Sequence, residues 1–164
     1  NIRKYDATTG RVIWQRDIPC IYQSYINGGA MATPLIGKDD ISDLIIFNIA
    51  LTGAGQAGKL IALDKNSGET VWERELMAYS WSSPVGVLCS ESGKTYAILA
   101  GFDGMLRLFD PRTGKDLHSI SLGGNIESSP AVFDDMIVVG SYAKKIFGVR
   151  IKIGRASCRV RVLI

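Results

Sequence analysis

The sequence predicts an all-β protein, a β-propeller fragment of four-stranded antiparallel blades with two complete blades and partial blades at both ends. One motif occurs three times in the sequence. It consists of an Asp, a Gly four residues later and a residue with a large ring, Trp or His, four residues after the Gly. A second motif ending in Pro follows each copy. The Asp64–Asp110 and Pro84–Pro130 spacings are both 46 residues. Two independent markers with one period indicate a structural repeat.

Each period contains four segments with the composition of short strands. They are rich in β-branched and aromatic residues and are bounded by Gly, Asp and Ser. No window keeps the i, i+3, i+4, i+7 spacing of a helix for ten residues. The near-continuous apolar runs also suit sheets that are covered on both faces. In the second period the segments are "SSPVGVL" (82–88), "TYAILAG" (95–101), "MLRLFD" (105–110) and "KDLHSISL" (115–122).

The repeated motif predicts a tight turn followed by a ring that lies over the neighbouring blade. The Asp carboxylate can cap backbone N–H groups of the turn, and the Gly can take a positive φ. The Trp on the next strand can then bury a large area. His118, the only histidine, is expected to be a core ring in the place of the Trp, because no Ser or Cys pairing motif surrounds it. The positions with this structural role are Asp6, Gly10, Trp14, Asp64, Gly68, Trp72, Asp110, Gly114 and His118.

One copy of the motif resembles a known family. "ALDKNSGETVW" (62–72) matches in full the A-x-D-x-x-[TS]-G-x-x-x-W docking motif of the pyrroloquinoline-quinone-like (PQQ-like) β-propeller repeat. The other copies depart from it, since Lys4 and Leu108 replace the Ala and His118 replaces the last Trp. The resemblance covers residues 1–152 and implies a ring of seven or eight blades, so we expect a parent protein two to three times longer.

The stretch "TGAGQAGK" (52–59) satisfies glycine patterns of nucleotide-binding loops. A phosphate-binding loop needs a following helix, whose N-terminal N–H groups hold the anion. Here "LIALD" (60–64) reads as a strand instead. Gly58 stands six residues before Asp64, as Gly104 stands six before Asp110, so the loop occupies the place of an ordinary hairpin turn. We therefore expect no nucleotide site.

The first period is 58 residues rather than 46, and its extra residues predict an enlarged rim on one face of the propeller. They fall in the connection between two blades and in the turn between the second and third strands, which open on the same face. Loops on a rigid scaffold often bind partners; a long loop without function is the alternative. Near the innermost strand, Trp81, Asn125 and Glu127 precede "SSP" motifs and are candidates to face the channel. The candidates of the rim are Tyr22, Gln23, Tyr25, Asn27 and Gln56.

The last residues, 153–164, differ from the repeats before them. "IGRASCR" (153–159) also resembles a translated sequencing adapter, so we expect a non-native tail from sequencing or assembly. Without its three Arg, the chain has 16 basic and 16 acidic residues, which leaves no basic face for nucleic acid. Cys20 and Cys89 lack metal-ligand spacing; we expect two separate buried thiols, with a disulfide as the alternative.

The sequence contains no constellation that predicts catalysis or a metal site. Asp39, Asp40 and Asp43 lack the spacing of a calcium loop. No apolar run is long enough to span a membrane. The resemblance favours a non-catalytic binding or scaffolding propeller that is exported, in the periplasm or at the cell surface, with a protein or small-molecule ligand on one face. It also allows part of a quinoprotein dehydrogenase, with PQQ and Ca²⁺, or a sensor propeller attached to a kinase.

Overall fold

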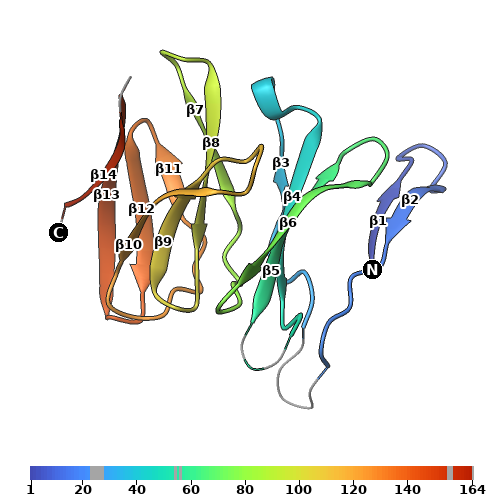
Figure 1. Ribbon diagram of the computed structural model, residues 1–164, viewed down its shortest axis with the longest axis horizontal. Helices are drawn as coiled ribbons and strands as arrows, with labels where there is room; N and C mark the ends of the chain where they lie inside the picture. The colour runs from blue at the N-terminus through green and yellow to red at the C-terminus, as the bar shows by residue number, and fades with distance from the viewer. Residues whose placement is uncertain (23–27, 54, 56, 155–156, 164) are drawn as a thin grey trace.

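A computed structural model describes residues 1–22, 28–53, 55, 57–154 and 157–163. Four antiparallel sheets stand side by side, with the N-terminus at one end of the row and the C-terminus at the other (Figure 1). The first sheet holds β1 (Ile2–Tyr5) and β2 (Val12–Arg16). The second holds β3 (Leu35–Ile36), β4 (Leu44–Ala50), β5 (Gly58–Asp64) and β6 (Thr70–Leu76), with a 3-10 turn, η1 (Asp39–Ile41), between β3 and β4.

The third sheet holds β7 (Val85–Cys89), β8 (Lys94–Ala100), β9 (Met105–Phe109) and β10 (Asp116–Ser121). The fourth holds β11 (Ala131–Phe133), β12 (Met136–Ser141), β13 (Lys145–Gly154) and β14 (Ser157–Leu163). In each sheet, consecutive strands of the sequence are neighbours, which is the up-and-down order of a propeller blade. The predicted all-β fold of four-stranded antiparallel blades is confirmed.

The fourth sheet differs from the expected partial blade because β14 completes it. β14 pairs with β13 from Gly154↔Ser157 to Gly148↔Leu163. Its residues belong to the segment that we expected to be a non-native tail. "SCRVRVL" alternates Arg with small or apolar residues, a period-two pattern that suits an edge strand. The domain boundary at residue 152 stays a prediction.

The hydrophobic core lies between the sheets and forms a separate cluster at each junction. Phe47 and Leu63 of the second sheet pack with Ile2 and Trp14 of the first. At the next junction, apolar side chains of β4 and β5 pack with β8 and β9, including the fully buried Phe109. At the last junction, side chains from β8, β9, β12 and β13 form one cluster. The second and third sheets are therefore covered on both faces.

The repeated Asp motif forms the predicted turn. The Asp64 carboxylate accepts hydrogen bonds from the backbone N–H groups of Asn66 (2.9 Å) and Ser67 (2.7 Å). These N–H groups, Ser67 first, lower the pKa of Asp64 below its ordinary value. Gly68 has a φ of 72°, in the left-handed region that glycine favours. The Asp6 carboxylate accepts equivalent bonds from Thr8 and Thr9.

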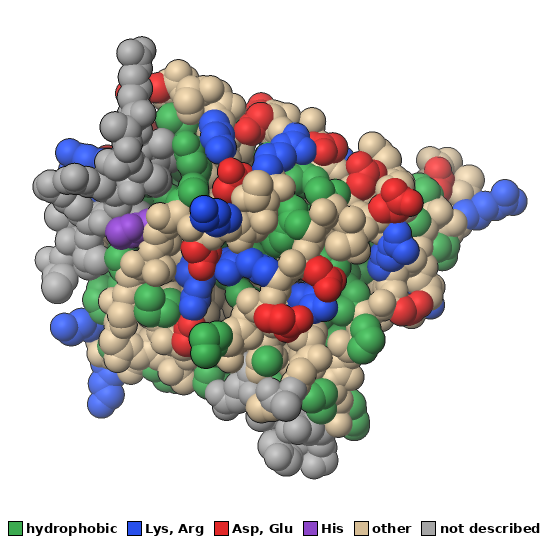
Figure 2. Space-filling model, in the orientation of Figure 1, with side chains coloured by type: hydrophobic (Ala, Val, Ile, Leu, Met, Phe, Trp, Pro, Cys, Tyr) green, Lys and Arg blue, Asp and Glu red, His purple; other side chains and the backbone are tan. Residues whose placement is uncertain are grey.

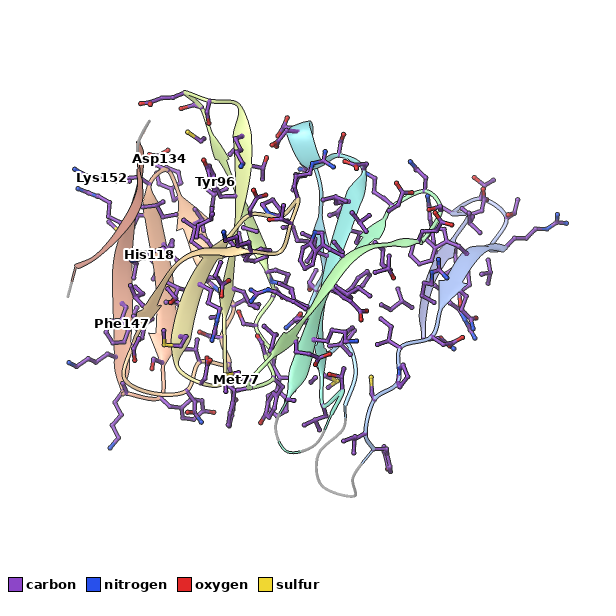
Figure 3. The ribbon with its side chains drawn as sticks, viewed as in Figure 1. Met77, Tyr96, His118, Asp134, Phe147 and Lys152 are labelled. Atoms are coloured by element: carbon purple, nitrogen blue, oxygen red, sulfur yellow. The ribbon has the colours of Figure 1, made fainter. Side chains whose placement is uncertain are left out.

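Each Trp of the motif docks on the turn of the following sheet, as the sequence predicts. The Trp72 indole N–H donates to the Pro111 carbonyl at 2.9 Å, and its ring meets Phe109 edge-on at 6.4 Å between centroids. The ring also lies directly over Gly114, where a Cβ atom would come within 2.6 Å of it. His118 takes the Trp position on β10, where it is half-buried (Figure 3).

The Pro motifs join neighbouring sheets through hydroxyl groups. The backbone N–H of Thr33 donates to the Ser83 hydroxyl at 3.1 Å. The backbone N–H of Ser83 donates to the Ser129 hydroxyl at 2.9 Å. All three residues stand directly before the Pro of their repeat, so these bonds form a ladder that runs from sheet to sheet along the first strands. This ladder of hydrogen bonds explains why the motif that ends in Pro recurs in each repeat.

Candidate functional site

One end of the sheets is a continuous rim, in which each connection between sheets is bound to the hairpin of the sheet that it enters. The Ile21 N–H donates to the Leu51 carbonyl at 2.7 Å. In the next repeat, the Phe102 N–H donates to the Tyr79 carbonyl at 3.1 Å. The third repeat has the same contact from the Tyr142 N–H to the Asn125 carbonyl at 2.9 Å. We call these connections and hairpins the rim.

The two insertions of the first period lie together in the rim. Gly29 and Ala50 exchange two backbone hydrogen bonds of 2.9 Å, which join the long connection to the β4–β5 hairpin. Tyr22 is on this connection and its side chain is 81% exposed. Four of the predicted rim residues lie outside the described residues, namely Gln23, Tyr25, Asn27 and Gln56. Their role stays a prediction.

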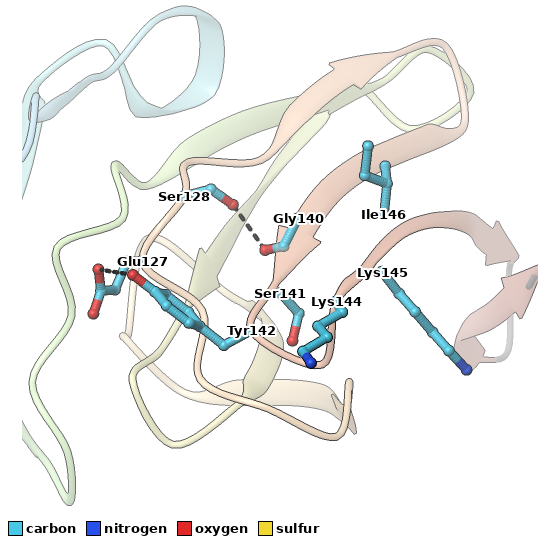
Figure 4. Close-up of a pocket in the computed structure, with 8 residues that line it drawn as sticks. All are labelled: Glu127, Ser128, Gly140, Ser141, Tyr142, Lys144, Lys145 and Ile146. Carbon is cyan, nitrogen blue, oxygen red and sulfur yellow. Dashed lines mark hydrogen bonds between the residues drawn. The ribbon is translucent and has the colours of Figure 1, made fainter.

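The two predicted channel residues of the last repeat lie in the rim near an open pocket. Asn125 is exposed, and Glu127 is half-buried. The Tyr142 hydroxyl donates to Glu127 Oε2 at 3.1 Å, and this carboxylate raises the pKa of Tyr142. The pocket has a volume of about 630 Å³ and extends along β12 and β13 past Gly140 to Ile146 (Figure 4).

An aromatic cluster adjoins Glu127 in the middle of the rim. The Tyr79 ring stacks on the Phe102 ring, with 4.6 Å between the ring centroids. The centroid of the Trp81 ring lies 5.1 Å from that of Tyr79. Burial raises the pKa of Tyr79, and the negative charge of Glu127 raises it further. The indole N–H of Trp81 is buried and has no acceptor among the described residues. Tyr79 is 3% exposed, whereas Trp81 and Phe102 are half-buried and keep part of their rings at the surface of the rim.

Sequence reasoning did not find Tyr79, Phe102 and Tyr142. A signal existed for two of them, because "GFDG" (101–104) and "SYAK" (141–144) follow the second strand of their repeats and place Phe102 and Tyr142 at aligned positions. Tyr79 had no such signal. Its place in the cluster depends on a contact between the connection and the hairpin of one repeat.

Asn48 holds the aromatic cluster in place from the neighbouring sheet. Its side chain is 2% exposed on β4, and its Nδ2 donates to the Ser80 carbonyl at 2.8 Å and the Ser82 carbonyl at 2.9 Å. The Ser80 hydroxyl donates to the Ala100 carbonyl at 2.6 Å. The connection on either side of Trp81 is therefore fixed to two sheets. Its aromatic side chains are presented by a rigid backbone.

The acidic side chains near η1 bind to separate partners and not to one another. Asp40 accepts from the Thr95 N–H at 3.0 Å, whereas Asp43 pairs with Arg112 at 2.7 Å. Within the described ranges, no group of three or more His, Cys, Asp or Glu side chains gathers to hold a metal ion. On the face that Figure 2 shows, acidic and basic side chains are interspersed. The acids near η1 thus join sheets.

The glycine-rich segment 52–59 ends in a strand, as predicted. β5 starts at Gly58, and its residues pair with β4 and β6 along their length. A helix N-terminus, which a phosphate loop requires, does not follow it. A Cβ atom on Gly58 would come within 2.9 Å of the Tyr79 backbone, so this glycine allows the rim to close tightly.

The prediction about the cysteines was correct in one respect and wrong in another. Among the described residues, Cys20 and Cys89 are separate free thiols. They are not buried, since Cys20 is exposed and Cys89 half-buried. Cys89 is the last residue of β7, and Cys20 lies in the connection after β2; the hydrophobicity of the sequence did not reveal their exposure. The Ser92 side chain and N–H lower the pKa of the Cys89 thiol.

Comparisons with known proteins agree with the repeat architecture. The family model described as outer membrane protein assembly factor BamB matches residues 56–160. The protein of that name from Kangiella koreensis is 24% identical over 166 residues, which cover 82% of this chain and 42% of that protein. The crystal structure of BamB from Moraxella catarrhalis aligns with a TM-score of 0.48 and 19% identity over 93% of this chain and 53% of that one. The chain thus spans about half the length of these relatives. No helix in the described part of the chain is long and apolar enough to cross a membrane.

Proposed function

The chain belongs to the PQQ-like β-propeller repeat family whose model is described as outer membrane protein assembly factor BamB, and on this premise we propose that it is a non-catalytic binding or scaffolding part of a propeller. Its partner is a protein or a small molecule that binds to one face of the propeller. That face is the rim, where three repeats present aromatic side chains at the same end of the sheets.

The observation that carries the proposal is the set of exposed aromatic side chains of the rim, Tyr22 and Tyr142, on either side of a fixed aromatic cluster. Tyr79, Trp81 and Phe102 contact one another, and Asn48 and Ser80 tie their backbone to two sheets. Rigid aromatic side chains bind with little loss of conformational entropy. A protein with such a surface can recognise a partner without chemistry at the site. Tyr22, 81% exposed on the connection of the first repeat, extends this surface.

The name of a similar protein suggests a function for the rim. The relative from Kangiella koreensis is named an outer membrane protein assembly factor. We extend this role to the present chain as a proposal: it is exported or associated with the cell envelope, and its partner takes part in assembly of outer membrane proteins. The described rim presents aromatic side chains together with both an acid, Glu127, and a base, Lys144, and this mixed surface suits a protein partner better than nucleic acid.

The alternative of a quinoprotein dehydrogenase requires donors for PQQ and Ca²⁺, and the described residues do not fit that group. Of the three acids nearest to one another in sequence, Asp39, Asp40 and Asp43, Asp40 binds the Thr95 N–H and Asp43 pairs with Arg112. The chain also lacks an adjacent Cys pair, which many quinoprotein dehydrogenases have.

Site-specific photo-crosslinking tests the proposed face. A benzophenone side chain replaces Tyr142 in the rim, which is 68% exposed, or Leu88 near the β7–β8 hairpin at the opposite end, which is 50% exposed. In cells that produce the protein, we expect crosslinks to envelope proteins from position 142 and none above background from position 88. Equal crosslinking from both positions, or turnover of an alcohol or sugar by the purified chain with PQQ and Ca²⁺, contradicts the proposal.

A further inference from the structure

The junction between the second and third sheets is open at the end opposite to the rim. Over most of this junction the side chains are closely packed, and Leu60 and Phe109 are both 0% exposed. Near η1 and the β7–β8 hairpin, which lie at the same end of the sheets (Figure 1), the junction instead holds a groove of about 310 Å³. Ligand pockets span about 300–1,000 Å³, so this groove suits a small molecule. Its walls belong to the two inner sheets of the row, each of which is covered on both faces.

The groove exists because β3 is shorter than the strand that faces it. β3 ends two residues after Pro34, whereas Leu88 on β7 stands four residues after Pro84, the equivalent position of the next repeat. Leu88 points towards the second sheet, because its neighbour Val87 packs on the opposite face. With β3 already ended, the Leu88 side chain stays 50% exposed although it points into a junction.

The walls of the groove are aliphatic. Leu35 from β3, Ile41 from η1 and Leu88 from β7 line it. Gly86 keeps it open, because a Cβ atom at this position would come within 3.2 Å of Leu35 Cδ1. An apolar group bound there contacts both sheets and removes the exposed surface of Leu88 from water, which is favourable.

Two exposed side chains of opposite charge, Lys38 and Asp39, also line the groove. The ion pairs found among the described residues all involve other side chains. The next acid, Asp40, is occupied by the Thr95 N–H at 3.0 Å. The groove therefore offers one ammonium and one carboxylate beside its aliphatic walls.

The wall beside Gly86 holds a further polar group. Thr95 lines the groove and is 7% exposed, and its hydroxyl is buried with no hydrogen-bond partner among the described residues. Its methyl group lies 3.7 Å from the Cβ position of Gly86, and a change of χ1 rotamer puts the hydroxyl in the place of the methyl group. Buried polar groups of native proteins nearly always have a partner, so this hydroxyl favours a ligand with a polar atom.

We propose that this groove binds a free apolar α-amino acid, such as leucine, in its zwitterionic form. The aliphatic side chain lies between Leu35 and Leu88, the carboxylate pairs with Lys38, and the ammonium pairs with Asp39. A simple carboxylic acid has no group for Asp39, and a simple amine has none for Lys38, so charge complementarity favours a ligand that carries both. The groove and the rim are at opposite ends of the sheets, and the proposal does not depend on the partner of the rim.

Isothermal titration calorimetry of the full chain with four probes tests the chemistry of the ligand. L-Leucine carries all three groups, whereas 4-methylpentanoate lacks the ammonium, 3-methylbutylamine lacks the carboxylate and glycine lacks the aliphatic side chain. We expect L-leucine to bind with a dissociation constant of about 1 mM or below, and about tenfold or more tightly than each other probe. An absence of L-leucine binding up to about 10 mM overturns the proposal. So does equal binding of 4-methylpentanoate or 3-methylbutylamine.

Four variants test the place of binding. Lys38→Gln and Asp39→Asn each remove one charge, and Asn tolerates the φ of 51° at position 39. Gly86→Leu fills the groove, and Lys115→Gln, at an exposed lysine outside the groove, is the matched control. We expect the affinity for L-leucine to fall about tenfold or more in the first three variants and to stay unchanged in the control.

Unchanged affinity in both charge variants overturns the proposal, and an equal loss in Lys115→Gln does so too. Circular dichroism verifies that each variant is folded. If Gly86→Leu does not fold, the two charge variants decide the outcome, because their side chains are exposed and their substitution leaves the walls of the groove intact.

Discussion

At the scale of single residues, two separate features of the structure favour glycine in the repeat motif, a positive φ and a neighbouring ring that leaves no space for a side chain. Gly10 and Gly114 have positive φ values of 69° and 71°. A Cβ atom at Gly114 meets the Trp72 ring at 2.6 Å, whereas at Gly10 nothing lies within 4 Å. Within the described chain, the positive φ is the requirement that Gly10 meets. Gly114 also requires the absence of a side chain, because the docked ring occupies that space.

Alanine substitutions separate these requirements. We expect Gly10→Ala to lower the free energy of unfolding by about 1–2 kcal/mol through backbone strain. Gly114→Ala adds the displacement of Trp72, about 1–3 kcal/mol more. Urea denaturation measures both losses. Equal losses in the two variants contradict the docking of Trp72 over the turn.

The lowered pKa of Asp64 makes the free energy of unfolding depend on pH. Hydrogen bonds from Ser67 and Asn66 lower the pKa of Asp64 in the folded chain below the ordinary 3.8. The ionised group therefore stabilises the fold above pH 3.8, and this contribution disappears as the pH falls through the folded pKa. We expect Asp64→Asn to be less stable than wild type at pH 6 and to approach it in more acidic buffer.

Thermal unfolding at a series of pH values measures this convergence. Glu69→Gln removes the same charge from an exposed side chain of the same turn, and it controls for net charge. A stability gap between Asp64→Asn and wild type that stays constant from pH 6 to the acid limit contradicts the account.

At the scale of elements, Trp72 connects the second sheet to the third. Its ring packs on Phe109 and its indole N–H donates to Pro111. Trp72→Ala is expected to lower the free energy of unfolding by about 3 kcal/mol, since it leaves a cavity between two sheets. Trp72→Phe keeps most of the packing and loses the hydrogen bond, for about 1 kcal/mol. Denaturation curves of both variants test this order; a Phe variant as unstable as the Ala variant contradicts it.

The hydroxyl ladder between the Pro motifs allows a second prediction about the junctions. Ser129→Ala removes the acceptor of the Ser83 N–H and is expected to lower the free energy of unfolding by about 1 kcal/mol. Ser129→Thr retains the hydroxyl and serves as the control. Hydrogen exchange of the Ser83 amide reports the same bond directly. Unchanged exchange in Ser129→Ala contradicts a ladder between the sheets.

At the scale of the whole molecule, the sequence predicted the parts that are encoded locally and repeated. The Asp, Gly and Trp positions predicted the turns. The apolar segments predicted strands whose bounds are close to the observed ones. Contacts between distant turns were not predicted. The Arg112–Asp43 ion pair joins residues 69 positions apart, and nothing in either turn indicates the other. The Tyr79–Phe102 stack was missed for the same reason.

The site residues named from the sequence stay a prediction. The insertions of the first period do lie in the rim, and Glu127 lies beside a pocket. The aromatic cluster was not found, because its members belong to a connection and a hairpin that are not neighbours in the sequence. Burial also depends on the whole molecule: Cys20 lies in a connection and Cys89 ends β7, and the sequence did not show that Cys20 is exposed and Cys89 half-buried.

The central claim is that the sheets are consecutive blades, each held by its neighbours. Hydrogen–deuterium exchange of the full chain, followed by mass spectrometry, tests it most directly. Covered sheets open with more difficulty than sheets with a free face. We predict the slowest exchange in β4, β5, β8 and β9, whose sheets are covered on both faces, and exchange faster by about tenfold or more in β1 and β2. Equal exchange in all strands, or the slowest exchange in β1 and β2, contradicts the account.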